Sequence, residues 1–385
     1  MKLRLLIPVS VLAAASNLFG QGNLTPPGPP AATMKTLDQV EARTIVNAAN
    51  TPGDATNTFI ISAPGSYYFT GNITGDTGKH GISVQSDDVT LDLNGFALIS
   101  GGGGAFRGIN VPAAQTKLCV RNGSVRGWTD GGVRVEAAVS LAEKLLLVNN
   151  TAATGLHVGN GSMIKDCVAS GNGTGFFADD RTHIINCIST ENTGVGFNCL
   201  SYVTLIDCTA GRNFGNAGIV VQGSCTVIRC NASRNILSGN GITAGPGCTI
   251  ADCTAGANGN NGIFAGTGST VRGCTAQVNL SDGIAVTSYC HVTGNTCVQN
   301  GGHGIEGILS PAAANRIEGN SCSANAGYGI KSSCQNCDYI MRNTCVGNGG
   351  APSGIASTDY NPKVGSYFGV FSTPGAASPS PWANF

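Results

Sequence analysis

A group of polar and ionisable residues between positions 134 and 198 recurs at steps of about 20 residues and could bind a charged ligand. Its members are Arg134, Glu136, His157, Asp179 and Asn198. A guanidinium such as that of Arg134 pairs with carboxylates, and an imidazole is the side chain most often used as a general acid or base. These residue types predict a ligand site if the fold brings successive repeats side by side.

Three neighbouring residues extend this group. Phe177 offers a flat aromatic platform for stacking, and either His157 or Arg181 is a candidate base. Carboxylates are ligands that Ca²⁺ prefers, so the weak candidates for a calcium site are Glu136, Asp179 and Asp180. No other metal or cofactor is expected. The alternative is an ordinary solvated sheet face in which Arg134 pairs with Glu136.

The elements that must position these residues are repeats of about 22 residues. One column of asparagines marks the repeats, at Asn172, Asn192, Asn213, Asn235, Asn258, Asn279, Asn300, Asn325 and Asn348. Self-similarity at such a period is the signature of a solenoid, in which each repeat buries its apolar face only against its neighbours. The sequence therefore predicts one continuous solenoid.

Each repeat contains three short apolar segments. The first carries an aliphatic residue three positions before a column that is cysteine from Cys167 to Cys274 and asparagine after that. The third begins with a glycine and an apolar residue, as in Gly283-Ile284, where the glycine could take a positive φ at a tight corner. No repeat has the periodicity of a packed helix. We therefore predict an all-β, single-stranded parallel β-helix of about 13 coils.

The asparagines Asn295, Asn320 and Asn343 resemble those that stack coil on coil in the right-handed parallel β-helix of the pectin-lyase-like superfamily, where they lie at the bend between that fold's second and third strands. The resemblance implies a right-handed helix whose enzymes bind polysaccharide across the outer face of the strand that starts with the glycine-apolar pair. On that face Arg134 would neutralise a uronate carboxylate and Phe177 would stack on a sugar ring. The outward residues are Ser83, Asn110, Arg134, His157, Phe177, Asn198, Val220, Thr243, Phe264, Ala285, Glu306, Lys331 and Ala356.

One further motif is similar to a known catalytic motif. Gly302-His303-Gly304 looks like the Gly-His-Gly of polygalacturonases, whose paired aspartates lie about one coil earlier. Because Asp179-Asp180 lies more than a hundred residues earlier here, we reject that match and assign His303 to a variable corner. Glu306 and Lys331, on neighbouring coils, are interpreted only as a cross-strand ion pair.

The ends of the chain differ from the repeats. Lys2 and Arg4 precede an apolar run to Ala15, which predicts a signal peptide over residues 1–20 and a secreted, extracellular or periplasmic protein. Residues 21–57 are predicted as a proline-rich arm and N-terminal cap with a short helix over residues 36–41, and residues 58–358 as the β-helix. Residues 359–385 would form a C-terminal cap or tail. Their ending, and the run Val89 to Gly95, look like those of uncharacterised secreted bacterial β-helix proteins.

The composition excludes some partners. The net charge is +0 and only 11% of residues are charged, so there is no basic patch for nucleic acid. Like charges repeated at one coil position would repel across about 5 Å, which explains their scarcity in a solenoid. After the signal peptide no apolar segment is long enough to span a membrane. We expect a monomer.

The chain contains 16 cysteines. In-register neighbours would hold their Cβ atoms about 4.8 Å apart, beyond the roughly 3.5–4.5 Å of a relaxed disulfide, so the column from Cys167 to Cys274 is expected to be mostly reduced. Local bridges are expected instead at Cys225, Cys248 and Cys290. The pair Cys334 and Cys337 is interpreted as a disulfide or as free thiols, because zinc needs four ligands.

Two classes of function fit these patterns. The favoured one is a secreted or surface-associated β-helix that binds polysaccharide or cell-surface glycan, or serves as a structural or adhesive rod, without catalysis. The alternative is a polysaccharide lyase, hydrolase or epimerase, for which three or more ionisable side chains should converge. An outward hydroxyl column could also bind ice or glycan passively. It comprises Thr209, Thr254, Thr275, Thr296 and Thr344, with Asn231 and Ser321 interposed.

Overall fold

The computed structural model describes residues 41–236, 239–308, 314–332, 338–349, 360–361 and 367–368. The chain divides into two compact units, Met1–Ala42 and Arg43–Phe385, and the fold described below is that of the second. The predicted signal peptide, the proline-rich arm, almost all of the short N-terminal helix, nearly all of the C-terminal tail and the pair Cys334 and Cys337 lie outside the described residues.

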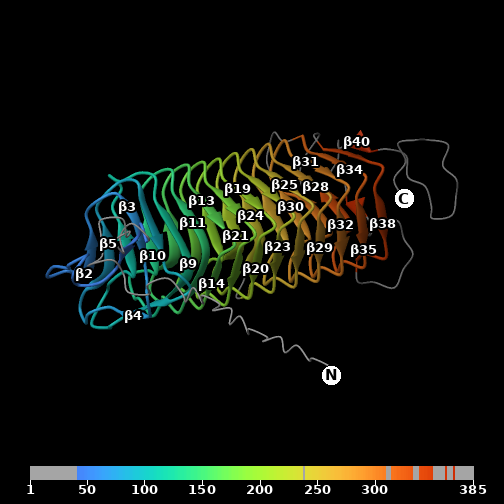
Figure 1. Ribbon diagram of the computed structural model, residues 1–385. Coiled ribbons are helices and arrows are strands. Elements are labelled where there is room, and N and C mark those ends of the chain that lie inside the picture. Colours follow the sequence, from blue (N-terminus) through green and yellow to red (C-terminus); the bar gives the residue numbers. More distant parts are fainter. Residues whose placement is uncertain are drawn as a thin grey trace, which may run out of the picture. The chain divides into compact units, whose positions relative to one another are not determined.

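The described part of the second unit is built from parallel strands without a helix (Figure 1). One sheet has 14 strands and contains the glycine-apolar pairs. Its strands are β2 (Asn57–Ile61), β5 (His80–Val84), β8 (Ile109–Val111), β10 (Val133–Val135), β12 (Thr154–Val158), β15 (Thr174–Ala178), β18 (Phe197–Cys199), β21 (Ala217–Val221), β24 (Asn240–Ala244), β27 (Ile263–Ala265), β30 (Ile284–Val286), β33 (Ile305–Gly307), β36 (Ile330–Ser332) and β39 (Tyr360–Asn361).

The second sheet has 26 strands and forms two ribbons that share two long strands, β9 (Cys119–Arg126) and β11 (Leu141–Val148). The aliphatic ribbon consists, besides these, of β1 (Thr44–Ile45), β3 (Gly65–Tyr68), β6 (Val89–Asp92), β13 (Met163–Lys165), β16 (His183–Ile185), β19 (Thr204–Ile206), β22 (Thr226–Ile228), β25 (Thr249–Ala251), β28 (Thr270–Arg272), β31 (His291–Thr293), β34 (Arg316–Glu318), β37 (Tyr339–Met341) and β40 (Tyr367–Phe368).

The threonine ribbon carries the hydroxyl column. Besides β9 and β11, it consists of β4 (Ile73–Thr74), β7 (Ala97–Ile99), β14 (Val168–Ser170), β17 (Ile188–Thr190), β20 (Thr209–Gly211), β23 (Asn231–Ser233), β26 (Thr254–Gly256), β29 (Thr275–Gln277), β32 (Thr296–Val298), β35 (Ser321–Ser323) and β38 (Thr344–Val346). Each coil thus contributes one strand to each ribbon and one to the 14-stranded sheet, which confirms the predicted β-helix of about 13 coils.

The register of the last coil differs from the prediction. Ile330 of β36 lies opposite Tyr360 of β39, and Lys331 lies opposite Asn361. The repeat spacing placed Ala356 opposite Lys331, and Ala356 lies outside the described residues. Asn361 therefore takes the register position that the repeat spacing assigned to Ala356.

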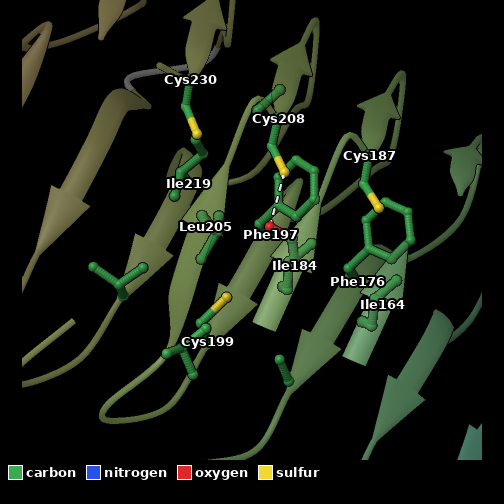
Figure 2. Close-up of a cluster of buried hydrophobic side chains, with 14 of the residues drawn as sticks. Ile164, Phe176, Ile184, Cys187, Phe197, Cys199, Leu205, Cys208, Ile219 and Cys230 are labelled. Atoms are coloured by element: carbon green, nitrogen blue, oxygen red, sulfur yellow. Dashed lines mark hydrogen bonds between the residues drawn. The ribbon is translucent and has the colours of Figure 1, made fainter. Parts of the chain in front are cut away.

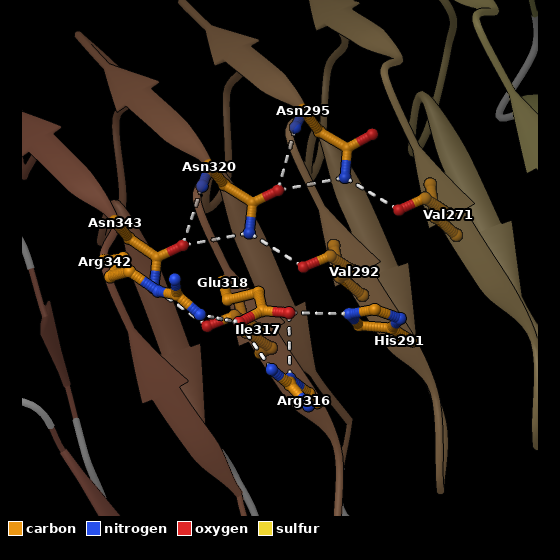
Figure 3. Close-up of polar contacts among 10 residues, drawn as sticks. All are labelled: Val271, His291, Val292, Asn295, Arg316, Ile317, Glu318, Asn320, Arg342 and Asn343. Carbon is orange, nitrogen blue, oxygen red and sulfur yellow. Dashed lines mark hydrogen bonds and ion pairs between the residues drawn. The ribbon is translucent and has the colours of Figure 1, made fainter. Parts of the chain in front are cut away.

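A ladder of buried asparagine amides joins the coils along the predicted column and begins one coil earlier, at Asn150. In a typical rung, Asn279 Oδ1 accepts hydrogen bonds from Asn258 N at 3.1 Å and from Asn258 Nδ2 at 2.9 Å. Asn258 Nδ2 also donates to the carbonyl of Ala232 at 2.9 Å. Asn295, Asn320 and Asn343 form a second such ladder, as predicted (Figure 3). Each amide satisfies backbone groups that a buried corner would otherwise leave unpaired.

The glycines of the glycine-apolar pairs are needed for a different reason from the one predicted. Gly262 and Gly283 do not have positive φ angles. The left-handed corner residues are mostly not glycine, as at Asp252 (φ 56°) and Ala257 (φ 55°). A Cβ on Gly262 would lie 2.6 Å from both Asn279 Nδ2 and the carbonyl oxygen of Gly283. The absence of a side chain therefore lets the next coil and the asparagine ladder approach.

The interior combines aliphatic, aromatic and cysteine side chains. Phe176 and Phe197 stack at a centroid distance of 5.0 Å beside buried Cys187 and Cys208 (Figure 2). The cysteines Cys225, Cys248 and Cys290 are free thiols, so the local bridges expected there are not formed. Instead the thiol of Cys248 accepts a hydrogen bond from the backbone N–H of Cys225 at 3.4 Å. These cysteines act as ladder acceptors as well as small apolar groups.

Candidate functional site

The predicted site residues lie side by side on the outer face of the 14-stranded sheet. Arg134 of β10 is in register with His157 of β12, and His157 with Phe177 of β15. Phe177 is in register with Asn198 of β18. All four side chains are partly exposed, because alternate residues of a strand point to opposite faces.

The ionisable groups of this face form separate pairs. Arg134 forms an ion pair with Glu136, while the Nε of Arg134 is buried without a hydrogen-bond partner. His157 Nε2 lies 3.2 Å from Asp179 Oδ1, and its ring meets Phe177 edge to face at a centroid distance of 4.7 Å. The face thus offers a cation, an imidazole held by a carboxylate and an aromatic ring on neighbouring coils.

Asp180 and Arg181 make their contacts in the corner that follows β15. Asp180 Oδ1 accepts the backbone N–H of Ser201 at 2.9 Å, and the guanidinium of Arg181 lies 5.7 Å from the centre of the Tyr202 ring. Each therefore has a structural role in this corner. Calcium binding by Glu136, Asp179 and Asp180 stays a prediction, and among the described residues these carboxylates do not gather as closely as the cluster described next.

A second group of ionisable side chains on the same sheet was not recognised as one site from the sequence. Ligand atoms of Asp282, His303 and Glu306 all lie within 4.8 Å of one another, and Lys331 Nζ lies 2.6 Å from Glu306 Oε1. His303 also stacks on Tyr328 at a centroid distance of 5.5 Å. Four ionisable side chains from three coils converge here, which we call the Asp282 cluster (Asp282, His303, Glu306 and Lys331).

The protonation of the Asp282 cluster follows from burial and mutual contact. Burial, together with the neighbouring Glu306 carboxylate, raises the pKa of Asp282 to about 6. Burial acts to raise the pKa of Glu306 too, but its hydrogen bonds with Lys331 and Asp282 outweigh burial and the net shift is downward. Burial and the Lys331 ammonium lower the pKa of His303. The cluster therefore holds one carboxyl group, that of Asp282, whose pKa of about 6 lies close to neutral pH.

A polar ladder explains how these side chains are held. From Asn240 to His303, the residue immediately before the glycine of each glycine-apolar pair accepts the backbone N–H of its successor on the next coil. Asp282 Oδ1 accepts from His303 N at 2.6 Å, and His303 Nδ1 accepts from Tyr328 N at 2.9 Å. The column runs through Asn240, Asn261, Asp282, His303 and Tyr328. His303 was placed in a corner from the sequence, as it is in the structure. Its contact with Asp282 could have been predicted from the column of polar residues that recurs once per coil before the glycine.

A third ionisable group lies on the aliphatic ribbon. Glu318 accepts from His291 at 3.0 Å, Arg316 at 2.9 Å and Arg342 at 2.9 Å (Figure 3). The Arg316 guanidinium, with help from His291 and Arg342, lowers the pKa of Glu318 to about 2. Because every member is engaged with one carboxylate, we interpret this group as an ion-pair network that links three coils.

Comparisons with known proteins agree with the fold. A family model described as "Right handed beta helix region" matches residues 193–348, and no curated protein has a matching sequence. The A-module of the mannuronan C-5 epimerase AlgE4 from Azotobacter vinelandii is similar in structure, with a TM-score of 0.54 and 15% identity over 79% of this chain and 90% of that chain. The described chain therefore has a right-handed parallel β-helix fold, as the sequence predicted.

Weaker structural similarities extend to two further proteins. A mutant form of the periplasmic alginate epimerase AlgG has a TM-score of 0.48 and 12% identity over 78% of this chain and 83% of that chain. The Dettilon tailspike protein has a TM-score of 0.37 and 13% identity over 80% of this chain and 59% of that chain. At these identities the likeness concerns the fold alone. Among the described residues, no helix is long and apolar enough to cross a membrane.

Proposed function

We propose that the protein binds polysaccharide along the outer face of the 14-stranded sheet, and that it is exported as the N-terminal sequence predicts and acts as a monomer. The proposal rests on one observation, the in-register run of Arg134, His157, Phe177 and Asn198. Successive coils stand about 4.8 Å apart, close to the rise of one sugar ring. A glycan laid along the coils would therefore meet one of these side chains at each ring.

The chemistry of the run suits an acidic glycan. The Arg134 and Glu136 side chains are about one-third exposed, and such partly solvated ion pairs are worth at most about 1 kcal/mol. A uronate carboxylate could therefore compete with Glu136 for the guanidinium. Phe177 supplies an apolar ring surface. The structurally similar AlgE4 module is named for mannuronan, a polysaccharide, which supports a glycan as the ligand.

Binding is tested with the mature protein and a panel of acidic and neutral oligosaccharides, followed by calorimetry and affinity gel electrophoresis. Phe177→Ala should weaken binding about fivefold, since it removes roughly 1 kcal/mol of stacking. Arg134→Ala should weaken the binding of acidic glycans only. Phe264→Ala is the matched control, because Phe264 occupies the equivalent outward position on β27. If the control abolishes binding while the other two variants bind normally, the site lies on different coils.

A second candidate function is catalysis on polysaccharide by the Asp282 cluster, as a lyase, hydrolase or epimerase. The observation that favours it is the convergence of four ionisable side chains, because acids and bases with separated pKa values are what such reactions need. Wild-type protein and Asp282→Asn would be incubated with polyuronates and neutral glycans. New unsaturated ends, new reducing ends and altered epimer ratios would each report one reaction. Turnover that survives Asp282→Asn, or no turnover by wild type, argues against this candidate.

A further inference from the structure

A groove lies on the outer face of the threonine ribbon, on a different sheet from the site proposed above. Its volume is about 500 Å³. It crosses β17, β20, β23, β26 and β29, so it runs along the stacking direction of the coils. The floor of the groove is lined by Thr209, Asn231 and Ser233, and its rim by Arg212 and Arg234.

The groove exists because two outward positions carry no side chain. One in-register column along its floor reads Thr190, Gly211, Ser233, Gly256 and Gln277. A Cβ on Gly211 would meet no heavy atom closer than 3.9 Å, and one on Gly256 none closer than 3.5 Å. Neither glycine has a positive φ. Packing and backbone geometry would therefore both accept a side chain at Gly211 and Gly256, and the glycines hollow the face.

The rim carries positive charge on two adjacent coils. Arg212 and Arg234 hold equivalent left-handed corner positions, with φ of 55° and 57°. Arg212 lies 3.6 Å from Glu191, and both side chains are more than half exposed, so the pair is weak and easily exchanged for another anion. Within the described part of the chain, Arg234 has no ion pair. The groove thus presents two guanidiniums against one carboxylate.

An apolar wall adjoins the two arginines. A neighbouring hollow of about 440 Å³ is lined by Phe214 and Ile236 together with Arg212 and Arg234. Phe214 is 39% exposed and Ile236 42% exposed. Flat sugar faces stack on such side chains while sugar hydroxyls need donors and acceptors. Thr209, Asn231 and Ser233 supply the donors and acceptors on the floor.

We propose that this groove is a second binding site, for a linear polysaccharide that carries a carboxylate on successive sugar units. Arg212 and Arg234 are one coil apart, about 4.8 Å, which is close to the rise of one sugar unit, so each guanidinium can meet a different unit of the chain. An extended acidic peptide fits less well, because its side chains on one face repeat every two residues, at about 6.8 Å. The site is independent of the proposed function, since it uses other residues on another sheet.

The test measures binding of galacturonate and guluronate oligosaccharides by calorimetry at low salt, with neutral oligosaccharides and polyglutamate as comparison ligands. To isolate the groove, all proteins carry Arg134→Ala and Phe177→Ala in the first site. Arg212→Gln with Arg234→Gln should weaken uronate binding at least tenfold, because each substitution removes a charge-assisted hydrogen bond. Gly211→Thr should weaken it similarly by filling the groove, while keeping a residue that strands favour. Thermal unfolding shows that each variant is folded.

The matched control is Arg272→Gln, an exposed arginine on the aliphatic ribbon outside the groove, and it should bind like its parent. The inference is overturned if the parent protein binds neither uronate ligand, or if the groove variants bind as tightly as the control. If polyglutamate binds as tightly as the uronate oligosaccharides, the groove is a site for an acidic peptide and the proposed polysaccharide ligand is wrong. Because every protein in this test already lacks the first site, the result does not depend on whether that site binds polysaccharide. A failure of the proposed function can therefore be distinguished from a failure of this inference.

Discussion

The backbone N–H of Cys274 donates to Asn295 Oδ1 at 2.9 Å, at the point where a cysteine column becomes an asparagine ladder. One type of acceptor replaces the other, because upstream the N–H of Cys230 donates to Cys253 Sγ at 3.5 Å. The exchange of residue type along this column therefore preserves one function, the satisfaction of a buried corner N–H.

Removing a rung of the long ladder should destabilise the protein strongly. Asn279→Ala leaves two donors of Asn258 and the carbonyl of Ala255 without their partner, and each buried unsatisfied group costs about 1–3 kcal/mol. We expect a loss of about 3 kcal/mol or more in the free energy of unfolding, measured by urea denaturation. Asn160→Ala, at an exposed turn, is the control and should change it by less than about 0.5 kcal/mol. Equal effects of the two substitutions would contradict a structural role for the ladder.

The sequence predicted the fold well because each coil repeats the same constraints. The aliphatic column, the asparagine column and the glycine-apolar pairs determine where the strands lie and which side chains point inward. A shift of one residue in the strand register would move the apolar side chains from the core to the solvent. The reason for Gly283 was missed because a close approach between coils is a property of the stack: its Cβ would lie 2.6 Å from the carbonyl oxygen of Gly304. Local sequence alone shows only that a corner lies nearby.

The candidate sites were predicted less completely. Arg134, His157 and Phe177 were placed on one face because they follow the repeat directly. The Asp282 cluster joins two columns, since Asp282 and His303 precede a glycine whereas Glu306 and Lys331 follow an apolar residue. Counting along one column cannot reveal contact between columns, because such contact depends on side-chain direction at the end of the strand.

The raised pKa of Asp282 predicts a pH-dependent cost to stability. Its pKa of about 6 in the folded protein lies above the ordinary value of 3.8, so its favourable contribution is complete below pH 3.8 and is lost as the pH rises through about 6. Asp282→Asn, which keeps an acceptor for His303 N, should therefore gain stability relative to wild type between pH 4 and pH 7. Allowing for solvent screening, the gain is about 1–2 kcal/mol, measured by urea denaturation at both pH values. If the difference in stability between Asp282→Asn and wild type is the same at pH 4 and pH 7, Asp282 is ionised in the folded protein at both pH values.

Glu318 predicts the opposite pH dependence. Its pKa of about 2 lies below the ordinary value of 4.5, so its contribution is present above pH 4.5 and is lost as the pH falls toward 2. Glu318→Gln should cost about 1 kcal/mol at pH 7 after allowance for screening, and much less at pH 2.5. Denaturant unfolding at the two pH values measures this. A cost that is as large at acid pH would mean that packing, rather than charge, gives Glu318 its effect.

Two glycines of similar appearance in the sequence should respond in opposite ways to the same substitution. Gly262→Ala places a methyl group 2.6 Å from Asn279 Nδ2 and from the Gly283 carbonyl oxygen, and should cost about 1–3 kcal/mol through overpacking. Gly211→Ala places the methyl group no closer than 3.9 Å to any heavy atom outside its chain neighbours, within strand β20, and should stabilise the protein by about 0.4–1 kcal/mol by restricting the unfolded chain. Thermal and urea unfolding of both variants measure the difference. Destabilisation by Gly211→Ala would mean that the hollow on the threonine ribbon is imposed by packing, and would remove the main reason to regard its glycines as features of a binding groove.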